Sequence, residues 1–182
     1  MLTDLSGKTK LVPVLASPVD HVIAPSAYNP AFAERGLNWL MVPMGVDPVD
    51  LAATLKQLAR VTNLQGVNVS IPHKSQAFSL CQWVTEEARV SGMVNTLRLE
   101  EKGIWSGTNT DGTGFLNALR AQKMLDVTRP VFVAGAGGAG TAIAFALAKV
   151  GFTTIDVVDI DKQRVSVLLH SLQRMFPNIT LG

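Results

Sequence analysis

The stretch PVFVAGAGGAGTAIAFALAKVGFTTIDVVDID, residues 130–161, decides the fold of this chain. Its first part, Val131 to Ala134, is a short apolar run that predicts a buried strand, and glycines spaced as G-x-G-x-x-G follow it. Thr141 to Val150 predicts an alanine-rich helix that ends at Gly151, and Thr154 to Val158 predicts a second strand. The order strand, glycine turn, helix, strand is typical of a βαβ unit in an open parallel sheet.

The glycine turn itself has the composition of a phosphate-binding loop. Its first glycine permits a tight turn, its second lets the backbone approach a pyrophosphate, and its third lets the helix pack against the strand. Unpaired N–H groups at the helix start attract the anion, and a carboxylate about 20 residues further on can bind a ribose 2′-hydroxyl. The alternative is a βαβ turn that uses glycine only for close packing. The predicted dinucleotide site consists of Gly135, Ala136, Gly137, Gly138, Ala139, Gly140, Asp159 and Asp161.

Size and composition exclude several classes of protein. The 182 residues suffice for about one to one and a half domains. The formal net charge of +2 is too small to indicate a nucleic-acid partner or an anionic membrane. Cys81 is the single cysteine, which excludes an internal disulfide, and no group of His, Cys and carboxylate residues has metal-ligand spacing, so we expect no metal. The N-terminus lacks an apolar signal core, and we therefore expect a cytoplasmic protein without a membrane segment.

The residues before the glycine turn alternate between strand and helix patterns, which predicts an α/β layer structure. We expect a substrate-binding and catalytic domain over residues 1–112 and the first half of a Rossmann-type, doubly wound dinucleotide-binding domain over residues 113–182. Asp47 and Asp111 are each expected to cap a helix. Expected strands cover residues 10–15, 37–42 and 66–71, a hairpin covers 94–106, and expected helices run over 25–36, from 47, from 74, and over 86–90, 113–122 and 162–176.

Polar residues gather at the ends of several predicted elements, where a packed core would not accommodate them. Lys74 follows a predicted strand end and can donate a proton to an oxygen that is being reduced. Asp111 can hold that lysine in place. Ser70, Asn95 and Asn109 can bind hydroxyl groups.

Four motifs give these residues a wider context: NVSIPHK at 68–74, MVNT at 93–96, GTNTDGTG at 107–114 and GAGGAG at 135–140. In order and spacing, the chain resembles the shikimate/quinate dehydrogenase family over about residues 13–160. The resemblance implies a catalytic pair, Lys74 and Asp111, and a substrate site formed by Ser70, Asn95, Asn68 and Asn109. It also implies reversible oxidation of a ring hydroxyl on a cyclic polyhydroxy acid such as shikimate, quinate or a related compound. The oligomeric state stays open, with a homodimer as the assembly considered.

Two departures from the family pattern bear on the substrate. The family's early loop carries two serines that hold the substrate carboxylate, whereas Val22 and Ala24 stand at those positions here. Each lost hydroxyl donor to a charged group is worth about 1.5–3 kcal/mol. We therefore expect a divergent member that acts on a related compound. The family also continues beyond the point that corresponds to Gly182, so the chain is interpreted either as a fragment or as a shortened protein.

The choice of nucleotide is predicted from charge. Asp159-Ile160-Asp161 follows the second strand, and two carboxylates there would repel a 2′-phosphate, so we expect NAD rather than NADP. An alternative from another class is a nucleotide-binding or regulatory protein that keeps the fold and has lost turnover. The serine replacements favour that alternative, and Lys74 with Asp111 opposes it.

Overall fold

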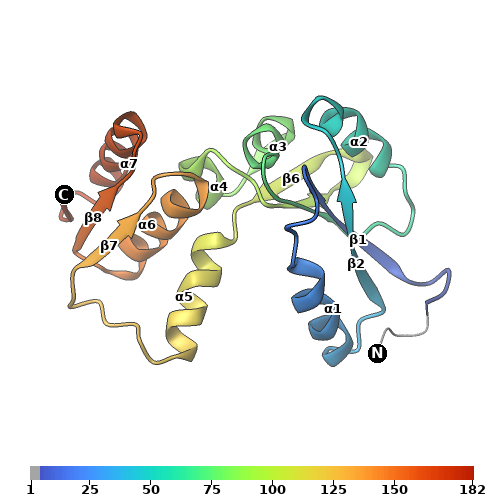
Figure 1. The fold of residues 1–182 in the computed structure, drawn as a ribbon, viewed down its shortest axis with the longest axis horizontal. Helices are drawn as coiled ribbons and strands as arrows, with labels where there is room; N and C mark the ends of the chain where they lie inside the picture. The colour runs from blue at the N-terminus through green and yellow to red at the C-terminus, as the bar shows by residue number, and fades with distance from the viewer. Residues whose placement is uncertain (1–4) are drawn as a thin grey trace. The chain divides into compact units, whose positions relative to one another are not determined.

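The computed structural model describes residues 5–182, which form two compact units (Figure 1). The first unit contains the residues up to Val84 together with Val94–Thr108, and the second contains Thr85–Met93 and Asn109–Gly182. The main division between the units, at Thr108 and Asn109, lies just before the expected boundary at residue 112. One short segment of the N-terminal half, Thr85–Met93, belongs to the second unit.

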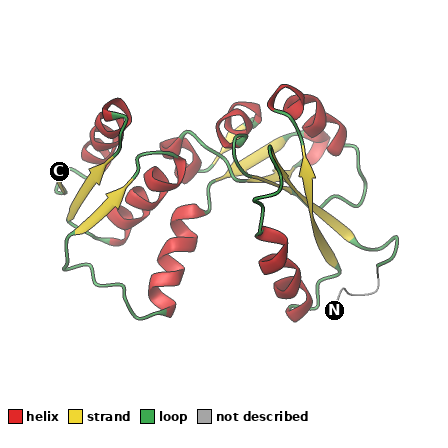
Figure 2. Ribbon diagram, viewed as in Figure 1, coloured by secondary structure: helices red, strands yellow, loops and turns green. Residues whose placement is uncertain are grey.

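The first unit is built on a six-stranded mixed sheet in the order β2-β1-β3-β5-β6-β4. β1 pairs in parallel with β2 and β3, whereas β5 is antiparallel to both β3 and β6. Figure 2 shows the strands among the helices that connect them. The strand bounds are β1 Lys10–Ala16, β2 Trp39–Gly45, β3 Val67–Val69, β4 Trp83–Val84, β5 Thr96–Leu99 and β6 Trp105–Thr108.

The helices of the first unit fall close to the expected segments. Phe32 of α1 packs with Val14 and Met41 in a buried cluster, which is why this helix lies on the sheet. The predicted cap at Asp47 is wrong, because its side chain accepts no cap hydrogen bond and instead accepts one from the Ser17 hydroxyl at 3.2 Å. The helices are α1 Ala24–Glu34, a 3₁₀ turn Pro48–Asp50, α2 Leu51–Leu58 and α3 Lys74–Leu80, with a second 3₁₀ turn at Glu101–Gly103.

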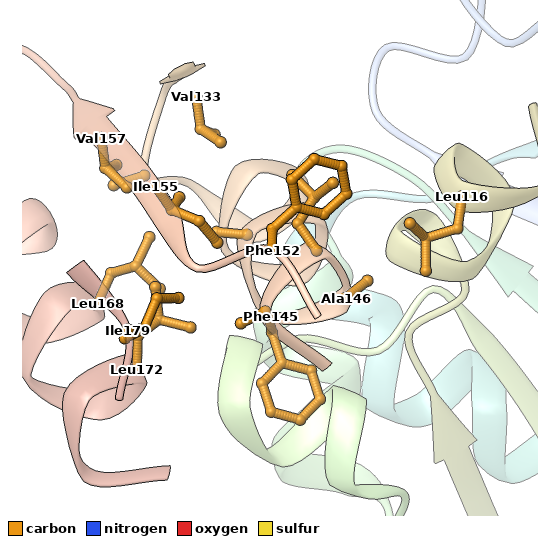
Figure 3. Packing of buried hydrophobic residues seen from close by; sticks show 14 residues of the cluster. Leu116, Val133, Phe145, Ala146, Phe152, Ile155, Val157, Leu168, Leu172 and Ile179 are labelled. Carbon is orange, nitrogen blue, oxygen red and sulfur yellow. The ribbon is translucent and has the colours of Figure 1, made fainter. Parts of the chain in front are cut away.

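The second unit has a three-stranded parallel sheet in the order β7-β8-β9, with a core against α6 and α7. Figure 3 shows Ile155 of the sheet on the side of Leu168 and Leu172 of α7, and Val133, Val157 and Phe145 belong to the same buried cluster. This arrangement confirms the predicted βαβ unit. The elements are α4 Glu86–Ser91, α5 Asp111–Ala121, β7 Val131–Ala134, α6 Gly138–Val150, β8 Thr154–Val158, α7 Lys162–Met175 and β9 Thr180–Leu181.

Several predicted boundaries in this unit need correction. Helix α6 begins at Gly138 rather than Thr141, because the glycines of the turn already form its first residues. Asp111 does not cap α5; it is the first helical residue, after Thr110. The two-residue strands β4 and β9 were not expected, since so short a run has no detectable alternation. Within residues 5–182, no helix has both the length and the apolar character needed to span a membrane.

Candidate functional site

The residues of the NVSIPHK motif lie at the carboxyl end of β3 and the start of α3, in the first unit. Lys74 is the first residue of α3, and its carbonyl accepts a hydrogen bond from the Val94 N–H at 3.0 Å. The carbonyl of Asn95 in turn accepts from the Val69 N–H at 2.9 Å. These two backbone bonds bring the MVNT segment beside the NVSIPHK segment, although about twenty residues separate them in sequence.

A short relay of side chains connects the two segments. The Asn68 amide donates to the Thr96 hydroxyl at 3.2 Å, and that hydroxyl donates to the Asn95 amide oxygen at 3.0 Å. Asn95 is 6% exposed, while Asn68, Ser70 and Lys74 are half-buried. The structure thus brings four of the predicted site residues to one strand end, and binding of a polyhydroxylated molecule by their polar groups stays a prediction.

His73 directly precedes Lys74 in the turn between β3 and α3. The His73 side chain is fully buried, and within residues 5–182 neither of its ring nitrogens has a hydrogen-bond partner. Its backbone N–H donates to the Ser70 carbonyl at 2.8 Å, and its carbonyl accepts from the Ala77 N–H at 2.8 Å. His73 therefore fixes the turn between Ser70 and Lys74 through its backbone.

The GTNTDGTG motif leads into the second unit. The Asp111 N–H donates to the Asn109 amide oxygen at 3.0 Å, and the Asn109 amide nitrogen donates to the Ser91 hydroxyl at 3.0 Å. Both ends of the buried Asn109 amide are therefore engaged with the protein and hold the start of α5 against α4. Lys74 and Asp111 belong to different units, so their pairing stays a prediction.

Two glycines of the turn have the conformation and the close packing that their spacing predicts. Gly135 has φ +107°, a conformation that L side chains rarely adopt. A Cβ on Gly140 would collide with the carbonyl oxygen of Gly135, so the third glycine allows the helix to approach the turn. A Cβ on Gly137 would meet nothing within 4 Å, which leaves open space beside the backbone. Gly137 also caps α6 without a side-chain hydrogen bond, and binding of a pyrophosphate at this helix start stays a prediction.

The two carboxylates after β8 have structural partners of their own. Asp159 accepts from the Ala136 N–H at 2.7 Å and from the Asp161 N–H at 2.8 Å. These bonds, that from Asp161 first, lower the pKa of the Asp159 carboxyl. Asp161 caps α7 by accepting from the Gln163 and Arg164 N–H groups, and its carboxylate lies 3.2 Å from the Arg164 guanidinium. Asp159 thus ties the glycine turn to the end of β8.

The early loop places apolar side chains where the family has serines. Val22 and Ala24 are half-buried and pack against the cluster of Val14, Phe32 and Met41. Neither side chain can donate a hydrogen bond. No group of three or more His, Cys, Asp or Glu residues in the described part of the chain could hold a metal ion.

Sequence comparisons show that the chain is similar to shikimate dehydrogenases. Residues 14–97 match the family described as the shikimate dehydrogenase substrate binding domain. The shikimate dehydrogenase (NADP(+)) of Rubrobacter xylanophilus is 41% identical over 155 residues, which are 85% of this chain and 54% of that protein. The corresponding enzyme of Geobacter metallireducens is 36% identical and covers 95% of this chain and 60% of its own length. The chain thus spans less than two thirds of these curated relatives.

Solved structures agree in fold over nearly the whole chain. The shikimate 5-dehydrogenase of Listeria monocytogenes, solved with shikimate and NAD, superposes with a TM-score of 0.89 at 26% identity and covers 100% of this chain and 63% of its own. A shikimate dehydrogenase solved with NADP+ gives a TM-score of 0.87 at 28% identity over 97% of this chain and 62% of its own. A 5-ketofructose reductase of Gluconobacter gives 0.86 at 26% identity, over 97% and 62%.

The predicted preference for NAD over NADP is wrong. The curated relatives are NADP(+)-dependent enzymes, and one of the similar structures holds NADP+. The charge argument relied on the two carboxylates of Asp159 and Asp161 and gave little weight to the Arg164 guanidinium, which lies 3.2 Å from Asp161. The structure instead bonds Asp159 to the glycine turn, and it pairs Asp161 with the start of α7 and with Arg164.

Proposed function

Because the chain belongs to the shikimate/quinate dehydrogenase family, we propose that it serves the reversible oxidation of a ring hydroxyl on a cyclic polyhydroxy acid. The observation that carries this proposal is the gathering of Asn68, Ser70, Lys74 and Asn95 around the carboxyl end of β3. An enzyme of this kind also needs a site for a dinucleotide, and the glycine turn at the start of α6 is the candidate for that site.

Lys74 is the proton-transfer residue in this proposal. Its side-chain nitrogen takes the proton of the substrate hydroxyl during oxidation and returns it to the carbonyl oxygen during reduction. Asp111 is its partner, and the Asn109 amide holds the turn that carries Asp111. A bound nicotinamide dinucleotide would exchange the hydride at the ring carbon.

Binding of the substrate is assigned to neutral polar groups. Asn95, Asn68 and Ser70 would orient the ring hydroxyls, because amides and hydroxyls both donate and accept. Asn109 would act through the turn before α5, since its amide is already bonded to the Ser91 hydroxyl and to the Asp111 N–H. Because Val22 and Ala24 are apolar, they favour a compound related to shikimate or quinate whose binding depends less on hydrogen bonds to a carboxylate. One similar structure is named for its action on 5-ketofructose.

The residues of the glycine turn and the start of α6 would hold the diphosphate of the dinucleotide. The curated relatives support NADP(+) as that dinucleotide. Asp159 acts by bonding the Ala136 N–H and so keeps the turn in its conformation.

The decisive experiment combines turnover with dinucleotide binding. We expect a panel of cyclic hydroxy acids to reveal turnover that Lys74→Ala lowers by about 10²–10⁴-fold, the usual contribution of a general acid–base group. Dinucleotide affinity, measured by calorimetry, should stay unchanged. Lys56→Ala on α2 is the matched control and should leave both quantities as in the parent.

Two outcomes would count against the proposal. A Lys74→Ala variant as fast as its parent would remove the assigned role of that lysine. Dinucleotide binding without turnover on any acid of the panel would favour the alternative, a nucleotide-binding or regulatory protein that keeps the fold, for which the loss of donors at Val22 and Ala24 is the supporting observation.

A further inference from the structure

Gly138 is a glycine of the turn that the G-x-G-x-x-G spacing does not require, since that spacing uses Gly135, Gly137 and Gly140. Gly138 is the first residue of α6, is buried and has no positive φ. A Cβ at this position would collide with the Met93 sulfur and would lie 3.0 Å from both Cγ and Cε of Met93. These three atoms are its nearest neighbours. Gly138 therefore makes room for the Met93 side chain.

The backbone of Met93 is held at the end of α4. Its N–H donates to the Ala88 carbonyl at 3.2 Å, and its carbonyl accepts from the Ser91 hydroxyl at 3.2 Å. At the other end of α4, the Glu87 carboxylate lies 3.0 Å from the ammonium of Lys149, which is near the end of α6. Both ends of α4 therefore contact α6, and the Met93 side chain is fixed at the first residue of that helix.

The Met93 thioether lies beside the N–H groups at the start of α6. The first N–H groups of an α-helix have no acceptor within the helix, and Gly137 supplies no side-chain cap. An unbranched thioether fills the irregular space next to them and excludes water from that side of the turn. Less polar surroundings strengthen the attraction between N–H dipoles and an anion. Packing on Gly138 also restricts the orientation of the first helical residue.

We propose that Met93 is a positioning residue for dinucleotide binding, a role that rests on the dinucleotide site of the proposed function. Its thioether packs on Gly138 and holds the start of α6 in the conformation that binds the diphosphate. Gly138 then acts by accommodating Met93 rather than by touching the dinucleotide. The two residues depend on each other, because a side chain at position 138 fits only when the side chain at position 93 is smaller.

Titration calorimetry with NADP(+) tests this role in the 182-residue chain, at a temperature where parent and variants are folded. Met93→Ala should weaken NADP(+) binding by about tenfold or more, because the start of α6 loses the side chain that orients it. Met175→Ala is the matched control, since Met175 is half-buried on α7 and packs against the core of the second unit. This control should lower the melting temperature and leave the NADP(+) affinity unchanged.

Gly138→Ala distinguishes the contact from a general loss of stability. Alone, it should weaken NADP(+) binding at least about fivefold, because the added methyl group collides with the Met93 sulfur. In the Met93→Ala background the same substitution should instead strengthen binding, because the methyl group occupies the vacated space. Gly114→Ala, in the first turn of α5, adds a Cβ that meets nothing within 4 Å and should leave the affinity unchanged. Circular dichroism verifies folding, and Gly138→Ala decides the test if Met93→Ala is unfolded.

Two results would overturn the role of Met93 and leave the proposed dinucleotide site intact. One is a folded Met93→Ala or Gly138→Ala variant that binds NADP(+) as tightly as the parent. The other is a Gly138→Ala substitution that weakens binding equally with methionine or alanine at position 93, which would assign Gly138 to direct contact with the dinucleotide. A parent chain that does not bind NADP(+) would overturn the proposed dinucleotide site itself, and the role of Met93 with it.

Discussion

Two glycines at the start of α5 face different surroundings, and alanine substitutions there should change stability in opposite directions. A Cβ on Gly112 would lie 2.8 Å from the Ala146 Cβ and closer still to the Ala142 carbonyl oxygen. A Cβ on Gly114 would meet nothing within 4 Å. Both glycines occupy the same helix, and neither has a positive φ. Comparing the two alanine variants therefore separates the effect of helix propensity on stability from the effect of close packing.

The expected changes in the free energy of unfolding follow from these contacts. Replacing glycine with alanine inside a helix stabilises it by about 0.8–1 kcal/mol. Overpacking costs about 1–3 kcal/mol, with the upper part of that range expected where the neighbour is backbone. Gly114→Ala should therefore raise the free energy of unfolding by about 0.5–1 kcal/mol, and Gly112→Ala should lower it by about 1–2 kcal/mol.

Thermal and urea unfolding followed by circular dichroism would measure both variants. For a domain of 60–100 residues, each kcal/mol shifts the melting temperature by about 4–8 °C. The three tryptophans, Trp39, Trp83 and Trp105, all lie in the first unit, so their fluorescence reports on that unit alone. A Gly112→Ala variant as stable as Gly114→Ala would refute the close approach of α5 to α6.

Three further predictions concern charged and reactive groups. Asp159→Asn should lower the free energy of unfolding at neutral pH, because the Asp161 N–H stabilises the charged carboxylate and lowers its pKa. The difference in unfolding free energy between variant and parent should vanish as the pH falls through the pKa of Asp159 in the folded protein. Urea titrations at several pH values would measure it. Lys149→Met should cost about 0.2–1 kcal/mol, and a double-mutant cycle with Glu87→Gln should show coupling that shrinks in high salt. Burial raises the pKa of the Cys81 thiol to about 11, so alkylation at pH 8, followed by mass spectrometry, should be at least about tenfold slower than in urea.

Helix packing and ion pairs between Lys149 and two glutamates join Thr85–Met93, a segment of the N-terminal half, to the second unit. Lys149 of α6 lies 3.1 Å from Glu86 and 3.0 Å from Glu87 at the start of α4. These contacts also lower the pKa of the Glu87 carboxyl, after the larger effect of its own backbone N–H. Exposed pairs add little stability, and most of the attachment therefore comes from packing of α4 on α6.

Local chemistry made much of the fold predictable. Strands β7 and β8 have the predicted bounds, because apolar runs flanked by glycine or a carboxylate signal their own ends. The tight turn at Gly135 and the close packing at Gly140 agree with the prediction for the same reason, since both depend on atoms a few residues away. The predicted helix cap at Asp111 was wrong, because the cap position depends on where the backbone turns helical, and that point is at Thr110.

The amino-acid sequence by itself determined the α/β class, the βαβ unit and the family, since periodicity and short motifs are carried by neighbouring residues. Only the tertiary structure decided what Asp159 binds, which unit holds α4, and that Lys74 and Asn95 lie around one strand end. Those facts depend on hydrogen bonds between residues far apart in sequence. Such bonds form only when packing of the core brings the strand ends together.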